Sequence, residues 1–183
     1  MKHCQIDLET LGTQPGSVIL SIGAVLFDPA LPPDQCIGEQ FYCVISKQSC
    51  LDAGLTVDLD TLAWWEKQSA GARQVLLDAE NPEVSDTLED ALKMFAAFLP
   101  EGVKVWSNGA NFDQPLLDVA YNRMGIALPW KYYNSRCHRT VVNLHPDEKR
   151  LRPINVLAHN ALEDAKWQTK HLVNIAQLLG LKL

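Results

Sequence analysis

Residues 3–11 read His-Cys-Gln-Ile-Asp-Leu-Glu-Thr-Leu, an alternation of side chains that is typical of a β-strand. Alternate residues of an extended chain share one face, so Asp7 and Glu9 point the same way. Two carboxylates this close repel each other unless a cation lies between them. The stretch therefore predicts either a strand that carries a cation-binding acidic pair or an acidic strand end that faces solvent. Its other face is apolar, through Cys4, Ile6 and Leu8.

The length and composition of the chain favour one globular domain over residues 1–183, since 47% of the 183 residues are hydrophobic and can form one sizeable core. The longest apolar run, residues 18–27, is too short to cross a bilayer, and the first residues lack the apolar stretch of a signal peptide. We therefore expect a cytoplasmic protein that makes no membrane contact. Its five cysteines form no Cys-x-x-Cys pair, which argues against a zinc knuckle and favours reduced thiols.

Charge is unevenly distributed along the chain. Residues 1–100 hold 15 acids and 5 bases, whereas residues 101–183 hold 7 acids and 11 bases. The net charge of −6 therefore does not exclude a polyanionic partner, because phosphate contacts depend on local basic groups.

Turn residues and hydrophobic periodicity predict an α/β protein with a mixed five-stranded sheet flanked by helices. The first three strands form an antiparallel meander, and the second is apolar enough to be covered on both faces. Strands after the first are predicted over residues 17–27, 40–45 and 103–107, with a last edge strand within 131–139. Helices are predicted over residues 58–68, 85–99 with Ser85 as its cap, 113–124 and 161–179, and a charged loop over 147–153.

Two adjacent tryptophans, Trp64 and Trp65, lie on the first predicted helix. Neighbouring helical residues point about 100° apart. We therefore expect at most one of them in the core, which leaves the other available to stack on a base. The alternative is that both serve only in packing.

Two later sites add acids and a histidine to the first pair. Asp113 stands where a strand leads into a helix, either as a functional acid or as an ordinary cap. Asn160 is predicted to cap the last helix, which places His159 before the cap and Asp164 four residues inside. These two positions commonly bring their side chains together. The alternative for His159 is a plain surface residue.

Together the four acids and the histidine fit one chemistry. Carboxylate oxygens suit Mg²⁺ or Mn²⁺, and two such ions can stabilise the attacking and leaving oxygens of a phosphodiester displacement. A neighbouring histidine can deprotonate the attacking water near neutral pH.

The sequence resembles the DEDDh branch of the DnaQ-like, ribonuclease-H-fold 3′→5′ exonucleases over nearly its whole length. The matching motifs are Asp-Leu-Glu-Thr at 7–10, Asn-Phe-Asp at 111–113 and His-Asn-Ala-Leu-Glu-Asp-Ala at 159–165. It is most similar to a smaller branch of phage exonucleases and a mycobacterial-type exoribonuclease, through the tryptophan pair and residues 105–113. Relatives tend to carry an acid where this chain has Cys137, which affects a supporting contact of the last strand.

The resemblance implies a ribonuclease-H-like sheet, two bound divalent ions, Mg²⁺ or Mn²⁺, and His159 as general base. It implies metal ligation by Asp7, Glu9, Asp113 and Asp164. It also implies that residues around the two acidic motifs and the tryptophan pair hold the substrate: Leu8, Thr10, Leu11, Trp64, Trp65, Asn111 and Phe112.

The implied reaction releases nucleoside monophosphates from the 3′ end of single-stranded RNA or DNA. One alternative is a DNA proofreading or repair exonuclease, because contacts to the 2′-hydroxyl decide between the sugars. A second is an inactive module that only binds nucleic acid. Small dinucleotides as substrates and a homodimer are left open.

Overall fold

The computed structural model describes residues 1–145 and 159–183. Its strands form one sheet in the order β3-β2-β1-β4-β5. The strands are β1 (His3–Thr10), β2 (Ile19–Phe27), β3 (Ile37–Val44), β4 (Lys104–Ser107) and β5 (Ser135–Cys137). β1, β2 and β3 pair antiparallel, while β4 runs parallel to both β1 and β5. The predicted mixed five-stranded sheet with an antiparallel start is confirmed.

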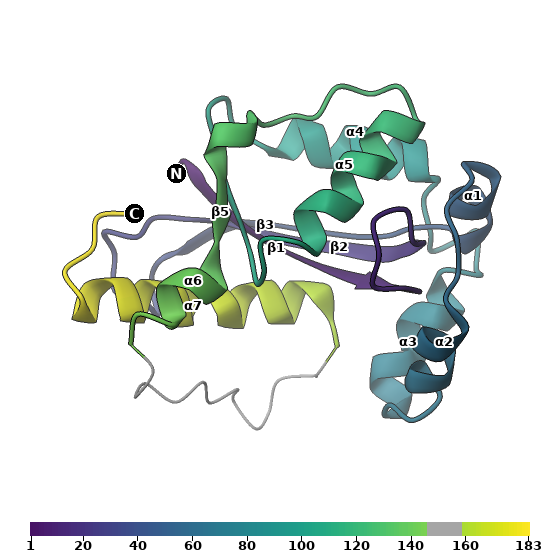
Figure 1. Ribbon diagram of the computed structural model, residues 1–183, viewed down its shortest axis with the longest axis horizontal. Helices are drawn as coiled ribbons and strands as arrows, with labels where there is room; N and C mark the ends of the chain where they lie inside the picture. Colours follow the sequence, from purple (N-terminus) through teal and green to yellow (C-terminus); the bar gives the residue numbers. More distant parts are fainter. Residues whose placement is uncertain (146–158) are drawn as a thin grey trace.

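Helices cover both faces of this sheet. Figure 1 shows α4 and α5 above the sheet, α6 and α7 below it, and the three short helices α1 to α3 beyond one end. The helices are α1 (Lys47–Asp52), α2 (Leu59–Trp65), α3 (Ala70–Asp78), α4 (Leu88–Phe98), α5 (Asp113–Arg123), α6 (His138–Val142) and α7 (Ala161–Leu178), with a 3₁₀ turn at Tyr132–Asn134. None of the described helices is long and apolar enough to cross a membrane.

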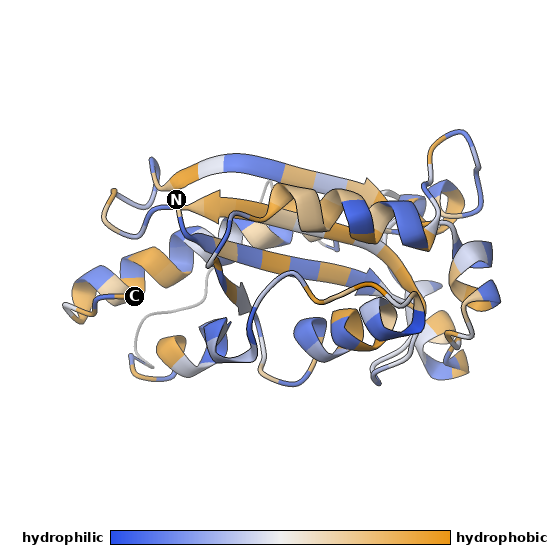
Figure 2. Ribbon diagram, turned by 90° about the horizontal axis from the view of Figure 1, so that it is seen from above, coloured by the Kyte–Doolittle hydropathy of each residue, from blue (hydrophilic) through white to orange (hydrophobic). Residues whose placement is uncertain are grey.

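β2 is the centre of the core, because all nine of its residues are buried. α7 packs against β1, β2 and β3 from below, and α4 and α5 pack from above. In Figure 2 one strand is orange along nearly its whole length, while the strands beside it carry both hydrophobic and hydrophilic residues. The expectation that this strand is covered on both faces is confirmed.

α7 lies unusually close to β2 at Gly23. In the sheet, Gly23 pairs with Asp7 of β1. A Cβ atom at Gly23 would lie only 2.1 Å from the carbonyl carbon of Ala161, in the first turn of α7. The missing side chain therefore allows the start of α7 to rest directly on the sheet, on the face that carries the acidic pair.

Several local predictions need correction. Thr87, not Ser85, caps α4, and its side chain accepts a hydrogen bond from the backbone N–H of Asp90, whereas the Ser85 hydroxyl donates to the carbonyl of Asn81. The third strand begins at Ile37, three residues earlier than predicted. The edge strand within 131–139 has only three residues, because a 3₁₀ turn precedes it and α6 follows.

Three short helices were not predicted: α1, α3 and α6. Each has five to nine residues and buries few side chains, so its apolar periodicity is weak. The predicted charged loop over 147–153 lies outside the described residues.

Candidate active site

β1 supplies the first acids of the site. Asp7 is half-buried and Glu9 is 7% exposed, and both lie along the cavity beside this strand. The strand pairing with β2 shifts register between Glu9 and Thr10, at the end of the acidic motif. Core packing of the strand on both sides thus fixes where the two carboxylates emerge.

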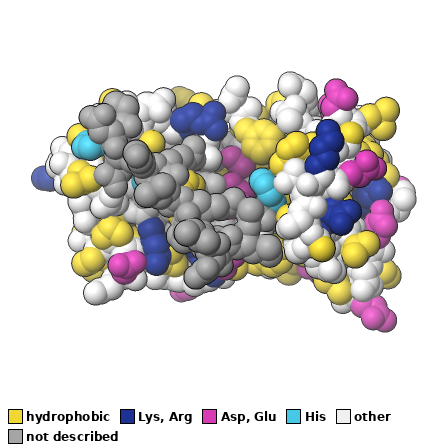
Figure 3. Space-filling model, turned by 90° about the horizontal axis from the view of Figure 1, so that it is seen from below, with side chains coloured by type: hydrophobic (Ala, Val, Ile, Leu, Met, Phe, Trp, Pro, Cys, Tyr) yellow, Lys and Arg dark blue, Asp and Glu magenta, His cyan; other side chains and the backbone are white. Residues whose placement is uncertain are grey.

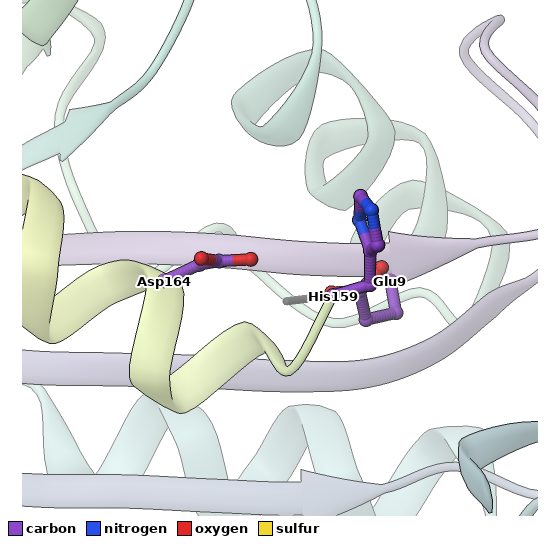
Figure 4. Close-up of side chains that lie close together, drawn as sticks. All are labelled: Glu9, His159 and Asp164. Atoms are coloured by element: carbon purple, nitrogen blue, oxygen red, sulfur yellow. The ribbon is translucent and has the colours of Figure 1, made fainter. Parts of the chain in front are cut away.

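The start of α7 supplies the histidine and another acid. Asn160 caps the helix as predicted, because its side-chain oxygen accepts a hydrogen bond of 3.1 Å from the backbone N–H of Glu163. His159 precedes the cap and Asp164 is 8% exposed. Glu9, His159 and Asp164 each offer a ligand atom, and these atoms lie within 4.8 Å of one another. Figure 4 shows the three side chains gathered between β1 and the beginning of α7.

His159 adopts a left-handed backbone conformation, with φ of 61°. Among the described residues it is the only one other than glycine with positive φ. Such a conformation costs on the order of 1–3 kcal/mol for a residue with a side chain, and strain of this kind concentrates at functional sites. The backbone is therefore held in a strained shape where the imidazole joins the two acids.

Asp113 is hydrogen-bonded to the backbone of the acidic motif in β1. It is 2% exposed, and its Oδ1 accepts a hydrogen bond of 3.2 Å from the backbone N–H of Leu8, between the two acids of β1. Phe112, rather than Asp113, occupies the cap position of α5. Burial raises the pKa of Asp113 to about 7, although hydrogen bonds from its own and the Leu8 backbone and the charge of Arg139 act in the opposite direction. Burial therefore disfavours the charged form of this carboxyl, and a nearby cation would favour it.

Gln168 is a residue of the site that the motifs did not indicate. Its Nε2 donates a hydrogen bond of 2.7 Å to Oδ1 of Asp7, and its Oε1 accepts one of 2.7 Å from Nε2 of Gln5. Gln168 lies one helical turn after Asp164, and Gln5 lies two residues before Asp7 on the same face of β1. This spacing is a signal that sequence reasoning could have used.

The acids face a cavity of about 780 Å³. Most predicted substrate-binding residues line it, namely Leu8, Thr10, Trp64, Trp65 and Phe112, together with Asp7, Glu9, His159 and Asp164. Leu11, which is fully buried, and Asn111 and Asp113 are not among the lining residues. Residues that were not predicted complete the lining: Thr13, Asp58, Asp60, Thr61, Asn108, Trp167 and Gln168. Figure 3 shows acidic, histidine and hydrophobic side chains gathered near the middle of the face seen from below.

The two tryptophans of α2 take different positions. Trp65 is 1% exposed, and its indole N–H donates a hydrogen bond of 2.9 Å to the carbonyl of Thr10. Trp64 is 41% exposed and meets the His159 ring edge-on, with ring centroids 4.9 Å apart. The prediction that at most one of the pair enters the core is confirmed. Trp65 thus anchors α2 to the end of β1, and Trp64 stands over the cavity beside the histidine.

Comparison with solved structures identifies the fold. Exonuclease X in complex with 5′ overhanging duplex DNA is 16% identical with a TM-score of 0.56, and the match covers 98% of this chain and 94% of that one. The nuclease domain of 3′hExo, a DEDDh family member bound to rAMP, is 11% identical with a TM-score of 0.61, covering 97% and 92%. The fold is therefore that of the ribonuclease-H-like DEDDh exonucleases, as predicted.

The sequence comparison gives the family. Residues 2–176 match the family described as the 3′-5′ exoribonuclease Rv2179c-like domain, so the chain belongs to this family. The predicted class of enzyme, a 3′→5′ exonuclease, is thereby confirmed. A search of the curated proteins found no match.

Proposed function

We propose that this enzyme removes nucleoside 5′-monophosphates one at a time from the 3′ end of single-stranded RNA, with the help of two divalent ions. The observation that carries the proposal is the convergence of Glu9, His159 and Asp164 within 4.8 Å at the cavity wall. Two carboxylates this close repel each other, and a cation between them offsets the repulsion.

The donor set fits Mg²⁺ or Mn²⁺. Asp7, Glu9, Asp113 and Asp164 would hold the ions, since hard oxygen ligands suit both metals. Asp113 supports the fit, because burial raises its pKa to about 7 and a bound cation would favour its charged form. When bound, the ions supply charge stabilisation for the attacking and leaving oxygens of the displacement.

His159 is the proposed general base. A ring nitrogen lies within 4.8 Å of a carboxylate oxygen of Glu9 and of Asp164, so the imidazole can take a proton from a water at the cavity wall. That water attacks the terminal phosphorus and the bond between phosphorus and O3′ of the preceding nucleotide breaks. The released nucleotide keeps the phosphate at its 5′ position, and the shortened chain ends in a 3′-hydroxyl.

The rest of the cavity is proposed to hold the terminal nucleotide. Trp64 offers its exposed indole to the base, and Leu8, Thr10 and Phe112 line the space around the sugar and phosphate. Leu11 and Asn111 remain predictions from the resemblance. Leu11 is positioned to support this wall from the core, because it is fully buried.

RNA is the proposed substrate because the matched family is described as an exoribonuclease. The wall opposite the acids of β1 is polar, with Thr13, Asp58, Asp60 and Thr61, and such groups can accept or exchange hydrogen bonds with a 2′-hydroxyl. DNA is the second candidate, because Exonuclease X, which shares this fold, forms a complex with 5′ overhanging duplex DNA.

The test uses 5′-labelled single-stranded RNA and DNA of one sequence, incubated side by side with Mg²⁺, with Mn²⁺ and with excess chelator. We expect a ladder shortened from the 3′ end, faster for RNA, blocked by a 3′-phosphate and absent in chelator. Faster loss of DNA would favour the repair alternative, and equal cutting of circular RNA would contradict an exonuclease. Binding of RNA without any shortening would identify an inactive module.

We further propose that the protein acts in the cytoplasm and that residues 1–183 form a single domain. All five cysteines are free, and four of them are buried, which is compatible with a reducing compartment. Light scattering on the purified protein tests for a homodimer.

A further inference from the structure

We propose that Trp167 is the stacking platform for the second base from the 3′ end, so that the site takes two nucleotides, one on each side of the bond that is cut. The inference rests on the proposed function and concerns the same cavity. It assigns Trp64 to the terminal base and Trp167 to the base before it.

Position along α7 carries the first step of the argument. Trp167 lines the same cavity as the acids and lies three residues after Asp164. At 1.5 Å per residue it stands roughly 4.5 Å further along the helix axis. Trp64, in contrast, contacts His159, which precedes the helix. The two indoles therefore flank the histidine and the acid along the direction of α7.

The Trp167 indole is supported from behind. It stacks on the ring of His171, one turn further along α7, with centroids 5.6 Å apart and an interplanar angle of 18°. His171 in turn meets the fully buried His138 of α6 edge-on, with centroids 5.4 Å apart. A ring held by such packing loses little conformational freedom when a base stacks on it, which is the general advantage of preorganisation.

Charged residues of α2 and α7 indicate the direction of the substrate. Asp58 and Asp60, at the start of α2, line the end of the cavity beside Trp64. These acids disfavour the phosphates of a continuing chain and suit an end without one. Lys170 lies three residues beyond Trp167 on α7 and is exposed, with its Nζ 3.2 Å from Asp34. A surface ion pair of this kind contributes little, so the lysine can also meet a phosphate. The upstream chain therefore leaves past Trp167.

Two substrates separate the two positions. A dinucleotide such as ApA fills both, whereas the methyl ester of adenosine 5′-monophosphate fills the terminal position and places only a methyl group, which cannot stack, on the other side of the bond. Stacking of one base on an aromatic side chain contributes on the order of 1–3 kcal/mol, which is about 5- to 150-fold in kcat/KM. Trp167→Ala should therefore lower the ratio of kcat/KM for ApA to that for the ester by about this factor.

Matched variants make the result decisive. Trp64→Ala should lower both rates and leave their ratio near the parent's, and Trp167→Phe should restore most of the lost ratio because it keeps a ring. Inhibition by AMP, which fills only the terminal position, should weaken more in Trp64→Ala than in Trp167→Ala. An equal loss on both substrates in Trp167→Ala, or no loss on either, would overturn the inference. A parent protein that hydrolyses neither ApA nor longer RNA would instead contradict the proposed function.

Discussion

The two walls of the cavity are built in different ways. On the side of β1 and α7, Glu9 and Asp164 are at most 8% exposed, and Gln168 connects Asp7 to the neighbouring Gln5. On the other side, α2 has seven residues and buries only Trp65 among them. The first wall takes its geometry from the core of the protein, while the second is a short helix that is mostly exposed and has Trp65 as its one buried residue. We infer that changes in the first wall affect the chemistry and changes in the second affect substrate binding.

The largest effect is expected from Asp7, the first of the two acids of β1 that face the cavity. Asp7→Ala should abolish exonuclease activity while the protein stays folded, because a proposed metal ligand is lost. The metal-free variant should be slightly more stable than the metal-free parent, since one of several repelling carboxylates is gone. The measurements are turnover on labelled RNA and the melting temperature in chelator. The matched control is Asp60→Asn on α2, which should keep measurable turnover, and full activity of Asp7→Ala would rule out the metal mechanism.

The next effect concerns the histidine at the start of α7. His159→Asn is the better variant than alanine, because asparagine tolerates the positive φ of this position. Single-turnover rates should fall by roughly 10²–10⁴, the usual contribution of a general base, while Mn²⁺ affinity stays near the parent's. Asp164→Asn should damage both quantities.

Two other results would assign His159 differently. A large loss of Mn²⁺ affinity in His159→Asn would make the imidazole a ligand, which its distance from Glu9 and Asp164 also permits. A lower melting temperature with unchanged turnover would make it a packing residue.

A smaller effect on metal affinity and activity is expected from Gln168, which contacts Asp7. Gln168→Met keeps the length of the side chain but removes the hydrogen bond to Asp7. Loss of a group that orients a metal ligand typically costs about 10- to 100-fold in metal affinity or activity. Titration with Mn²⁺ and turnover on RNA measure both. Gln177→Met, an exposed change further along α7, is the control, and equal behaviour of the two variants would show that the bond does not orient Asp7.

The smallest effect appears in stability rather than activity. Burial raises the pKa of Asp113 from 3.8 to about 7, so in this interval the folded state holds a proton that the unfolded state has lost. The contribution of Asp113 to stability is therefore fully present below pH 3.8, the unfolded-state pKa. It is lost as the pH rises through the folded-state pKa of about 7. In chelator, the free energy of unfolding should fall more steeply with pH in the parent than in Asp113→Asn. Parallel curves for the two proteins would show that this carboxyl is not perturbed.

The sequence predicted those parts that depend on local pattern. The strand alternation placed Asp7 and Glu9 on one face, and the capping signal of Asn160 brought His159 beside Asp164. The long amphipathic helix α7 was predicted to within one residue of its end. Each of these features is decided by neighbours in the chain, which is why a single sequence suffices.

Features that depend on tertiary contacts were missed. The hydrogen bond between Gln168 and Asp7 joins residues 161 positions apart, and the burial of Asp113 follows from its contact with Leu8, 105 positions away. The short helices α1 and α3 lie beyond one end of the sheet and bury too few side chains to leave a periodic signal. The roles of the site residues remain predictions that the variants above test.

The contact at Gly23 has a consequence for how this protein could change during evolution. The residue does not line the cavity, yet a single added methyl group there would collide with the backbone of Ala161 at 2.1 Å. The sheet cannot yield easily around β2, so the start of α7 would have to move and carry His159 and Asp164 away from Asp7 and Glu9. One substitution outside the cavity could thus leave α2 in place and separate the proposed metal ligands of β1 from those of α7. Gly23 is therefore a position where one substitution in this protein could abolish the proposed cleavage and keep the proposed binding of nucleic acid.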